Sequence, residues 1–308
     1  MKGFQQNRKE EKQNMFQHQY QKNIDTIRQK IQEAEAIVVG GAAGMSAAAG
    51  YNWYLDDANF RKYFNSFAQE YGIDSIFGGF YYRFRTEEER WAYLATLINF
   101  VTEVPIGQPY KDLDQILRDK NYYILTTNQD TQFLQVFPEE KVSAIQGNWT
   151  YLQCSGPCHD GIYPYAEQAK ELCAHIKGTR IPSSMVPKCP ECGGPMELWV
   201  RSFVFLEGAK FRDEHKKYRE FLMENQSKKV LFLELGVGLM TPMFIKEPFW
   251  NMTYSWLDAY YITINPNPEH NLLPRELKDK GLAVHEDIGQ VLRDVLAEQQ
   301  KERKQDAV

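Results

Sequence analysis

The sequence predicts an α/β protein in which a mostly parallel sheet domain carries a smaller inserted domain. Short apolar runs of strand length recur along the chain and alternate with helical patterns, which is typical of a parallel sheet. The first run ends in a glycine turn. Residues 51–105, rich in aromatic side chains, and residues 147–201, which contain the cysteines, interrupt the alternation. We expect these two segments to form the smaller domain together.

The bulk composition is that of an ordinary globular protein. The 308 residues are 43% hydrophobic and 25% charged, and the net charge is −5. A negative balance gives no general attraction to nucleic acid or anionic lipid. No apolar run approaches the roughly 18 residues of a membrane helix, and the polar, Gln-rich start lacks the apolar core of a signal peptide. We therefore expect a cytoplasmic protein without a nucleic-acid or membrane partner.

The N-terminal segment, residues 5–35, contains no proline or glycine and predicts one long helix. Its apolar residues recur in steps of three and four, which indicates one apolar face. They are Phe16, Tyr20, Ile24, Ile27 and Ile31. This face can pack on the core of the same chain or against a partner helix in a coiled coil, and we expect the first.

The sheet begins with residues 36–40, a short apolar strand that breaks at Gly40-Gly41 and continues into the small residues 42–50. A strand, a glycine turn and a helix start, in this order, open a dinucleotide-binding unit, so we expect a Rossmann-like domain. Helical patterns cover residues 110–120 and 287–300. The further strands are predicted at residues 122–127, 141–145, 230–235, 260–264 and 282–284.

The domain organisation follows from these elements. The predicted small domain comprises residues 51–105, helical over 57–71 and 86–102, and residues 147–201. The Rossmann-like domain comprises residues 1–50, 106–146 and 202–308, with an N-terminal helix over 1–35.

Two cysteine pairs predict a zinc ribbon. Cys154-x3-Cys158 is followed, after 30 intervening residues, by Cys189-x2-Cys192. Two such knuckles supply the four ligands of a tetrahedral zinc and leave no open position, so the metal would be structural. The odd total of five cysteines, without an export signal, favours metal binding over disulfides. We interpret three residues between the pairs as bystanders, although any one of them could replace Cys154 or Cys158 as a ligand: His159, Cys173 and His175.

Polar residues follow two of the predicted strands. The segment Thr126-Thr-Asn-Gln-Asp130 comes directly after an apolar run, and the next strand leads into Ala144-Ile-Gln-Gly-Asn148. Ligands of open α/β sheets bind beyond the carboxyl ends of the strands. These two segments are therefore the predicted walls of a binding site.

Five motifs together resemble the sirtuin signature, in the order in which sirtuins carry them, over residues 35 to 290. They are Gly44-Met-Ser46 with Gly50, Thr127-Asn128 with Asp130, the cysteine pairs, Gly236-x-Gly-Leu-x-Thr-Pro242, and Ile264-Asn265. The resemblance implies an enzyme that uses NAD as a substrate.

Four positions depart from the usual sirtuin pattern. The loop reads Ala42-Ala43-Gly44 instead of Gly-Ala-Gly, and residues 51–54 replace an Ile-Pro-Asp-Phe-Arg stretch. The His-Gly pair of deacylases is Gln146-Gly147, and a segment ending in Arg201 replaces one ending in Phe-Gly. These departures resemble the microbial sirtuins found beside a macrodomain and a lipoyl carrier protein. That resemblance implies a protein ADP-ribosyltransferase acting on a lipoylated glycine-cleavage H-like protein, with a macrodomain hydrolase that reverses the modification.

The resemblance also implies roles for single residues. Asn128 would orient the nicotinamide ribose, Asp130 would hold the carboxamide, and Gln146 would contact the ribose. Arg201 would hold an incoming carboxylate or the pyrophosphate, unless it forms an ordinary surface ion pair. Tyr51 and Trp53 would cover the nicotinamide pocket or belong to the core. With Asn128, Asp130 and Gln146, the implied NAD-binding residues are Gly41, Ala42, Ala43, Gly44, Ser46, Gly50, Tyr51, Thr127, Gln129, Gly236, Val237, Gly238 and Asn265.

The change from histidine to Gln146 bears on the reaction type. Histidine titrates near neutrality and can act as a general base, whereas glutamine has no titratable proton. Loss of such a base removes about 10²–10⁴-fold in rate. Direct transfer to a protein nucleophile does not need the later deprotonation, so the residue favours a transferase over a deacylase. The same pocket would also serve an NAD glycohydrolase or an inactive NAD-binding module.

We further hypothesise that residues 51–105, including Phe77–Tyr82, dock the carrier.

Overall fold

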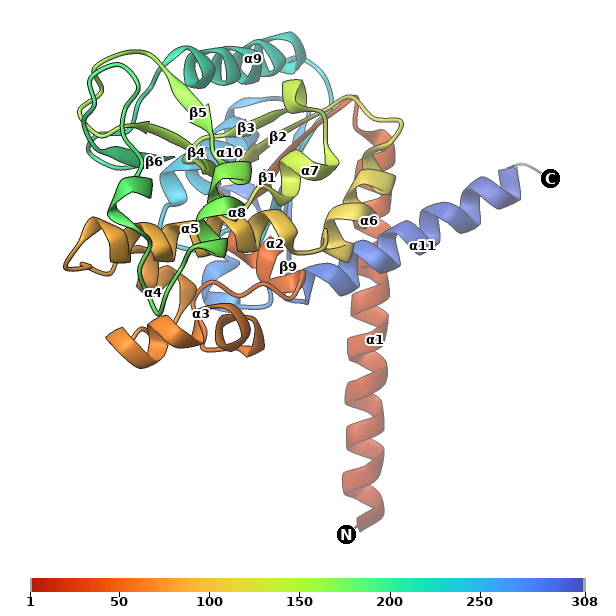
Figure 1. Ribbon diagram of the computed structural model, residues 1–308. Helices are drawn as coiled ribbons and strands as arrows, with labels where there is room; N and C mark the ends of the chain where they lie inside the picture. Colours follow the sequence, from red (N-terminus) through yellow and green to blue (C-terminus); the bar gives the residue numbers. More distant parts are fainter. Residues whose placement is uncertain (1, 307–308) are drawn as a thin grey trace.

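The computed structural model describes residues 2–306 and is built on a six-stranded sheet (Figure 1). All five strand pairs are parallel, in the order β3-β2-β1-β7-β8-β9. The strands are β1 (Ala36–Gly41), β2 (Tyr122–Thr126), β3 (Val142–Ala144), β7 (Val230–Leu235), β8 (Ala259–Ile264) and β9 (Gly281–Val284). The prediction of an α/β protein with a mostly parallel sheet is confirmed.

The strand order places a reversal between β1 and β7. From β1 the chain moves outward to β2 and β3, then returns to add β7, β8 and β9 on the other side. At such a reversal the connections diverge to opposite faces and leave a crevice at the carboxyl ends of the strands. The fold therefore offers its binding site beyond the ends of β1 and β7.

Helices cover both faces of the sheet, and the alternation of side chains along β1 shows why. Ile37 and Val39 pack into one apolar cluster, while Ala36 and Val38 pack into the opposite one. The first cluster is covered by α1 (Lys2–Glu33), α2 (Ala43–Ala48), α6 (Gln108–Leu117), α7 (Gln132–Val136) and α11 (Ile288–Asp306). The second is covered by α9 (Ala209–Asn225) and α10 (Lys246–Ser255).

The long helix α1 packs on the body only through its last turns. Ile24, Ile27 and Ile31 are buried there, whereas Phe16 is 58% exposed. Figure 1 shows the N-terminal part of α1 running away from the rest of the chain. The expectation that the whole apolar face packs intramolecularly is wrong for Phe16, because among the described residues no element lies beside that part of α1.

The two inserted segments share one apolar core. The helices α3 (Ala58–Tyr71), α4 (Ile76–Phe80) and α5 (Glu87–Glu103) pack with a three-stranded antiparallel sheet and α8 (Ala166–Ala174). That sheet has the order β5-β4-β6, with β4 (Gly147–Cys154), β5 (Ile162–Pro164) and β6 (Met196–Val200). The start of α5 is fixed by a capping box in which Thr86 and Glu89 satisfy each other's backbone amides.

Short 3₁₀ turns complete the structure at η1 (Glu139–Lys141), η2 (Ser183–Met185), η3 (Pro242–Phe244), η4 (Pro268–His270) and η5 (Arg275–Leu277). Among residues 2–306, none of the helices combines the length and the apolar character that crossing a membrane requires.

Candidate active site

A cavity of about 800 Å³ lies at the carboxyl ends of the parallel strands, where the sheet meets the smaller domain. Its walls come from the loops after β1, β2, β3, β7 and β8, and from residues of the two insertions. Twelve residues that the sequence assigns to the site line this cavity: Ala42, Ala43, Gly44, Thr127, Asn128, Gln129, Gln146, Arg201, Gly236, Val237, Gly238 and Asn265.

Five predicted site residues lie outside the cavity wall, which the sequence did not anticipate. Gly41 ends β1 with its Cα facing the ring of Phe133. Tyr51 turns away and donates to the carbonyl of Pro105 at 2.7 Å, and Gly50 follows the end of α2. Ser46 and Asp130 are fully buried behind the wall. A bound ligand could touch these five residues only if neighbouring groups moved. Otherwise they can affect the ligand only through the residues that form the wall.

The floor of the cavity is formed by two glycine turns in contact. The amide N–H of Gly44 donates to the carbonyl of Gly236 at 3.1 Å. A Cβ added to Gly44 would lie 2.6 Å from the Gly236 Cα, and Gly236 has a positive φ of 66°. Only glycine allows both the close approach and the left-handed conformation. The backbone of the two turns therefore forms the floor without side chains in front of it, which suits the close approach of a pyrophosphate.

Asn128 is held in one orientation by the residues behind it. Its Nδ2 donates to the carbonyl of Ala42 and to the Ser46 hydroxyl, each at 3.0 Å. A carbonyl oxygen can only accept, so the amide nitrogen must face Ala42 and the amide oxygen must point the other way. None of the described residues donates to that Oδ1, and Asn128 lines the cavity. The free oxygen is thus available to a hydroxyl of a bound ligand.

Asp130 is the buried charge beneath the site. Its carboxylate accepts from the Ser46 hydroxyl and from the amide of Gln132 at 3.2 Å. Burial raises the pKa of Asp130, and the hydrogen bonds from Ser46, Gln132 and Trp53 partly offset that rise. The hydroxyl of Tyr110, 3.3 Å from Ser46 Oγ, completes this group.

Gln146 and Arg201 are brought together by strand pairing. Gln146 directly precedes β4 and Arg201 directly follows β6, and Gly147 pairs with Val200. The amide of Arg201 donates to the Gln146 carbonyl at 2.9 Å, and its Nη2 donates to the Ile145 carbonyl at 3.0 Å. Register in the small sheet thus places both side chains at the same wall of the cavity.

The guanidinium of Arg201 is more constrained than a surface ion pair. It stacks 4.2 Å from the ring centre of Phe205 and 5.0 Å from that of Phe211, and it pairs with Glu207. Its Nε is buried and has no partner among the described residues. Nη1 donates to Glu207 and Nη2 donates to the Ile145 carbonyl, and none of the described residues accepts the second hydrogen of either nitrogen. An arginine with such donors at a cavity wall is suited to hold an anionic group.

An aromatic wall faces these polar residues. Trp53 and Trp149 meet edge to face with ring centres 5.2 Å apart, and Tyr54 lies 4.8 Å from Phe77. These four side chains, with Tyr81, line the cavity. The wall comes from both insertions, so the cavity is completed only when the smaller domain packs on the sheet.

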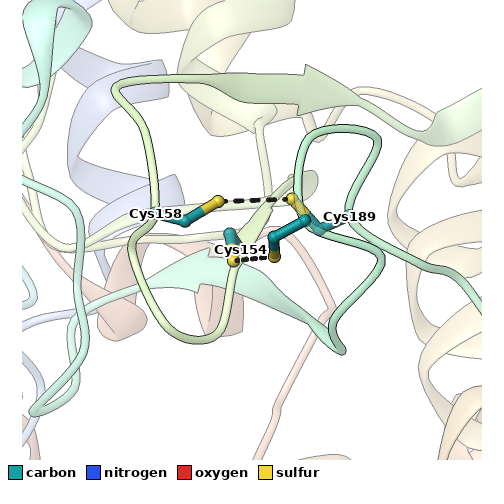
Figure 2. Close-up of side chains that lie close together, drawn as sticks. Cys154, Cys158 and Cys189 are labelled. Carbon is teal, nitrogen blue, oxygen red and sulfur yellow. Dashed lines mark hydrogen bonds between the residues drawn. The ribbon is translucent and has the colours of Figure 1, made fainter.

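The four predicted cysteines converge between two loops (Figure 2). Their sulfur atoms lie within 4.8 Å of one another; Cys154 and Cys192 are 3.7 Å apart, and Cys158 and Cys189 are 3.6 Å apart. A disulfide would need about 2.05 Å. Four thiolates placed tetrahedrally about 2.3 Å from one zinc ion are roughly 3.8 Å apart, so the donor set and its spacing fit zinc.

None of the three possible substitute ligands belongs to the four-cysteine cluster found among the described residues. Cys173 on α8 and His175 at its end are not part of it. His159 lies beside it, with Nδ1 3.0 Å from Cys158 Sγ and Nε2 2.6 Å from the Tyr163 hydroxyl. This arrangement orients the ring so that it contacts a cysteine sulfur without replacing any of the four cysteines.

Known proteins share this fold. A Sir2 homologue in complex with NAD superposes with a TM-score of 0.57 at 15% identity, over 90% of this chain and 94% of that chain. Sir2Tm bound to a propionylated peptide gives a TM-score of 0.56 at 17% identity, over 89% of this chain and 98% of that chain. Models of protein families gave no match.

The sequence relation is closer to a transferase. A protein ADP-ribosyltransferase of Staphylococcus aureus is 32% identical over 276 residues, which cover 88% of this chain and 86% of the relative. This chain belongs to the sirtuin-fold protein ADP-ribosyltransferases. A probable bifunctional ADP-ribose hydrolase/ADP-ribosyltransferase of Fusarium oxysporum f. sp. cubense is 29% identical over 285 residues. The aligned residues cover 88% of this chain but 47% of the Fusarium protein, so this chain spans about half the length of that relative.

Several cavity residues of this sirtuin-fold transferase could not be assigned from the sequence. The aromatic composition of residues 51–105 was a signal for Tyr54, Phe77 and Tyr81, but it did not separate cavity from core. Nothing in the sequence indicated His270, which lines the cavity, or Tyr110, which lies behind its wall. His270 is placed by the turn after β8, and Tyr110 sits on the apolar face of α6 like any core residue.

Proposed function

We propose that this transferase cleaves NAD, releases nicotinamide and transfers ADP-ribose to a side chain of a protein acceptor. The observation that carries the proposal is the absence of a base near Gln146. Among the described residues lining the cavity there is no carboxylate, and the one imidazole, His270, lies at the opposite end beside Gly238. Burial raises the pKa of Tyr54 and of Tyr81, so neither accepts a proton at neutral pH.

Different residues of the cavity are proposed to bind different parts of NAD. The glycine turns are proposed to receive the pyrophosphate, and Asn265, which follows β8 and lines the cavity, is proposed to contact the adenosine ribose. Asn128 offers Oδ1 to a hydroxyl of the nicotinamide ribose, and Gln146 orients the same sugar without accepting a proton. Asp130 acts through Trp53 and Ser46 to favour release of the carboxamide-bearing base. The bond from C1′ to nicotinamide breaks, and the acceptor nucleophile forms the new bond to C1′.

Arg201 is proposed to steady negative charge at the acceptor side of the cavity. Its position beside Gln146 and the second hydrogens of its Nη1 and Nη2 suit a carboxylate of the acceptor or a pyrophosphate oxygen. A lysine there would lack the planar donor arrangement that stacks on Phe205 and keeps several N–H groups available.

The proposed acceptor is a lipoylated, glycine-cleavage H-like carrier protein. The resemblance to macrodomain-associated sirtuins supports this choice, and exposed aromatic side chains at the cavity mouth are compatible with it. Tyr54 is 45% exposed and Tyr81 61% exposed, and both line the cavity. We propose that the segment Phe77–Tyr82 contacts the carrier; unchanged transfer rates after Tyr81→Ser and Tyr82→Ser would remove that part of the proposal.

The deciding experiment reads intact masses. The enzyme is mixed with NAD, a lipoylated carrier protein and an acetyl-lysine peptide. ADP-ribose on the carrier with the acetyl group intact supports the transferase. Loss of the acetyl group means that another residue supplies the base, and free nicotinamide without a modified carrier indicates an NAD glycohydrolase. An unlipoylated carrier and the Asn128→Ala variant serve as controls, and both are expected to show no modification.

Two further parts of the proposal concern cofactor and partner. Cys154, Cys158, Cys189 and Cys192 are proposed to hold a structural zinc, and a cytoplasmic location would keep their thiols reduced. A macrodomain hydrolase is proposed to remove the modification. The bifunctional name of the Fusarium relative supports that pairing, because it combines an ADP-ribose hydrolase with the transferase in one chain.

A further inference from the structure

Tyr110 is a fully buried tyrosine whose hydroxyl reaches the active site from behind. It lies on α6, its exposed fraction is 0%, and its ring packs edge-on against Phe133 with ring centres 4.8 Å apart. The hydroxyl lies 3.3 Å from Ser46 Oγ and 3.3 Å from Asn128 Nδ2. It does not line the cavity, so it does not touch a bound ligand.

Counting hydrogens fixes the direction of each bond in this group. The Asp130 carboxylate can only accept, so the Ser46 hydroxyl donates to it. Ser46 Oγ can then only accept further bonds, and Tyr110 donates to it. Burial and the charge of Asp130 raise the pKa of Tyr110 well above its ordinary value, so its proton is always present.

The same count shows what holds Asn128. One hydrogen of Nδ2 goes to the Ala42 carbonyl, and the other points between Ser46 Oγ and the Tyr110 oxygen. Both hydrogens are engaged only while the Tyr110 and Ser46 oxygens stay in place. Oδ1 is then left for the ribose.

We infer that Tyr110 is a positioning residue: its hydroxyl fixes the Ser46–Asn128 pair so that Asn128 Oδ1 faces the reacting ribose. This inference rests on the proposed function, because it assumes that Asn128 contacts the sugar from which nicotinamide departs. A hydrogen bond that aligns a group for the transition state affects the chemical step more than ground-state binding.

The test is Tyr110→Phe, which removes only the hydroxyl and keeps the ring packed on Phe133. Loss of one hydrogen bond is expected to lower kcat for nicotinamide release roughly 3- to 10-fold, with KM for NAD within about twofold. Tyr218→Phe is the matched control: Tyr218 is also buried, lies on α9, and its hydroxyl has no partner among the described residues. Its kcat is expected to stay unchanged.

Coupling and a spectroscopic readout separate positioning from simple packing. In combination with Ser46→Ala, Tyr110→Phe is expected to cause little additional loss, because both act through the same bond. The side-chain amide protons of Asn128, assigned by their absence in Asn128→Asp, are expected to exchange with solvent faster in Tyr110→Phe. Unchanged kcat and unchanged exchange overturn the inference. The exchange result tests it even if the wild-type enzyme releases no nicotinamide, an outcome that would instead overturn the proposed function.

Discussion

At the residue scale, Gln146 separates this cavity from one built for base catalysis. A glutamine contributes hydrogen bonds at every pH, whereas a histidine contributes a charge change near neutrality. Asn128 and Gln146 in the cavity wall both carry amides, and none of the described lining residues carries a carboxylate.

We therefore expect the rate of nicotinamide release to vary little between about pH 6 and 8. Gln146→His should introduce a dependence with a midpoint near the ordinary histidine pKa, about 6.5. Initial rates with NAD and carrier across this range test both statements. A wild-type profile with a midpoint near neutrality would show that a titratable group serves as a base, either the His270 imidazole in the cavity wall or a group outside it.

Asp130 allows a prediction about stability. Burial raises its pKa in the folded state, so the unfolded chain loses its proton at lower pH than the folded chain does. The carboxyl group therefore favours folding most below its unfolded pKa of about 3.9, and this contribution is lost as pH rises through the higher folded value. We expect Asp130→Asn to unfold at a higher temperature than wild type at pH 7 and to lose that advantage near pH 3.5.

Calorimetric scans of both proteins at the two pH values provide the measurement. The variant should also release nicotinamide more slowly, which would show that the buried charge is kept for function at a cost in stability. An equal or lower melting temperature for Asp130→Asn at pH 7 would contradict the argument, because it would mean that the hydrogen bonds to the carboxylate outweigh its burial.

At the element scale, the contact between the turns after β1 and β7 is the tightest constraint on the site. Gly44→Ala would push a methyl group into the Gly236 backbone, which can move only by opening the cavity floor. We expect a destabilisation of about 1–3 kcal/mol and a KM for NAD raised at least roughly tenfold. Gly156→Ala is the control, because no atom lies within 4 Å of an added Cβ there. Denaturant titration and steady-state kinetics measure the two effects.

The cysteine cluster leads to a prediction about metal removal. Cys189→Ser should lose zinc, lower the melting temperature and impair transfer, because β4 and β6 also place Gln146 and Arg201. Cys173→Ser should keep one equivalent of zinc, since Cys173 lies outside the cluster. Elemental analysis and thermal unfolding decide the matter; equal zinc content in the two variants would show that the four-cysteine set is wrong.

The strands and helices also show which parts of the fold could be predicted from the sequence. β1 and β7 were predictable because strands buried on both faces read as continuous apolar runs, and the glycine turn marked the crevice. The pairing of Gly147 with Val200 was not, because register across a long insertion depends on tertiary contacts. Asn128 and Gln146 were predictable because they are polar residues that follow apolar strands. Tyr110 was not, because it lies on the apolar face of α6 and resembles any other core residue in the sequence.

At the scale of the whole molecule, α1 consists of an anchored part and a projecting part. Deleting residues 1–19 should change the melting temperature by less than about 2 °C, because it removes no buried apolar side chain among the described residues. Deleting residues 1–33 should lower it markedly, since Ile24, Ile27 and Ile31 would leave the core exposed. Differential scanning fluorimetry of the two truncations measures this, and similar curves would mean that the anchored turns contribute little.

The pairing of Gly147 with Val200 also has a consequence for how such enzymes diversify. The chain leaves the sheet domain and returns to it at adjacent points, so the cysteine-bearing stretch between them behaves as a cassette. Segments whose ends lie close together are readily exchanged or inserted without disturbing the host fold. A ribbon from a related transferase could be joined at these two residues only if it kept the apolar side chains that pack against residues 51–105, because both insertions share one core. Trp149 lies within the cassette and lines the cavity, so exchanging the ribbon would also reshape one wall of the site.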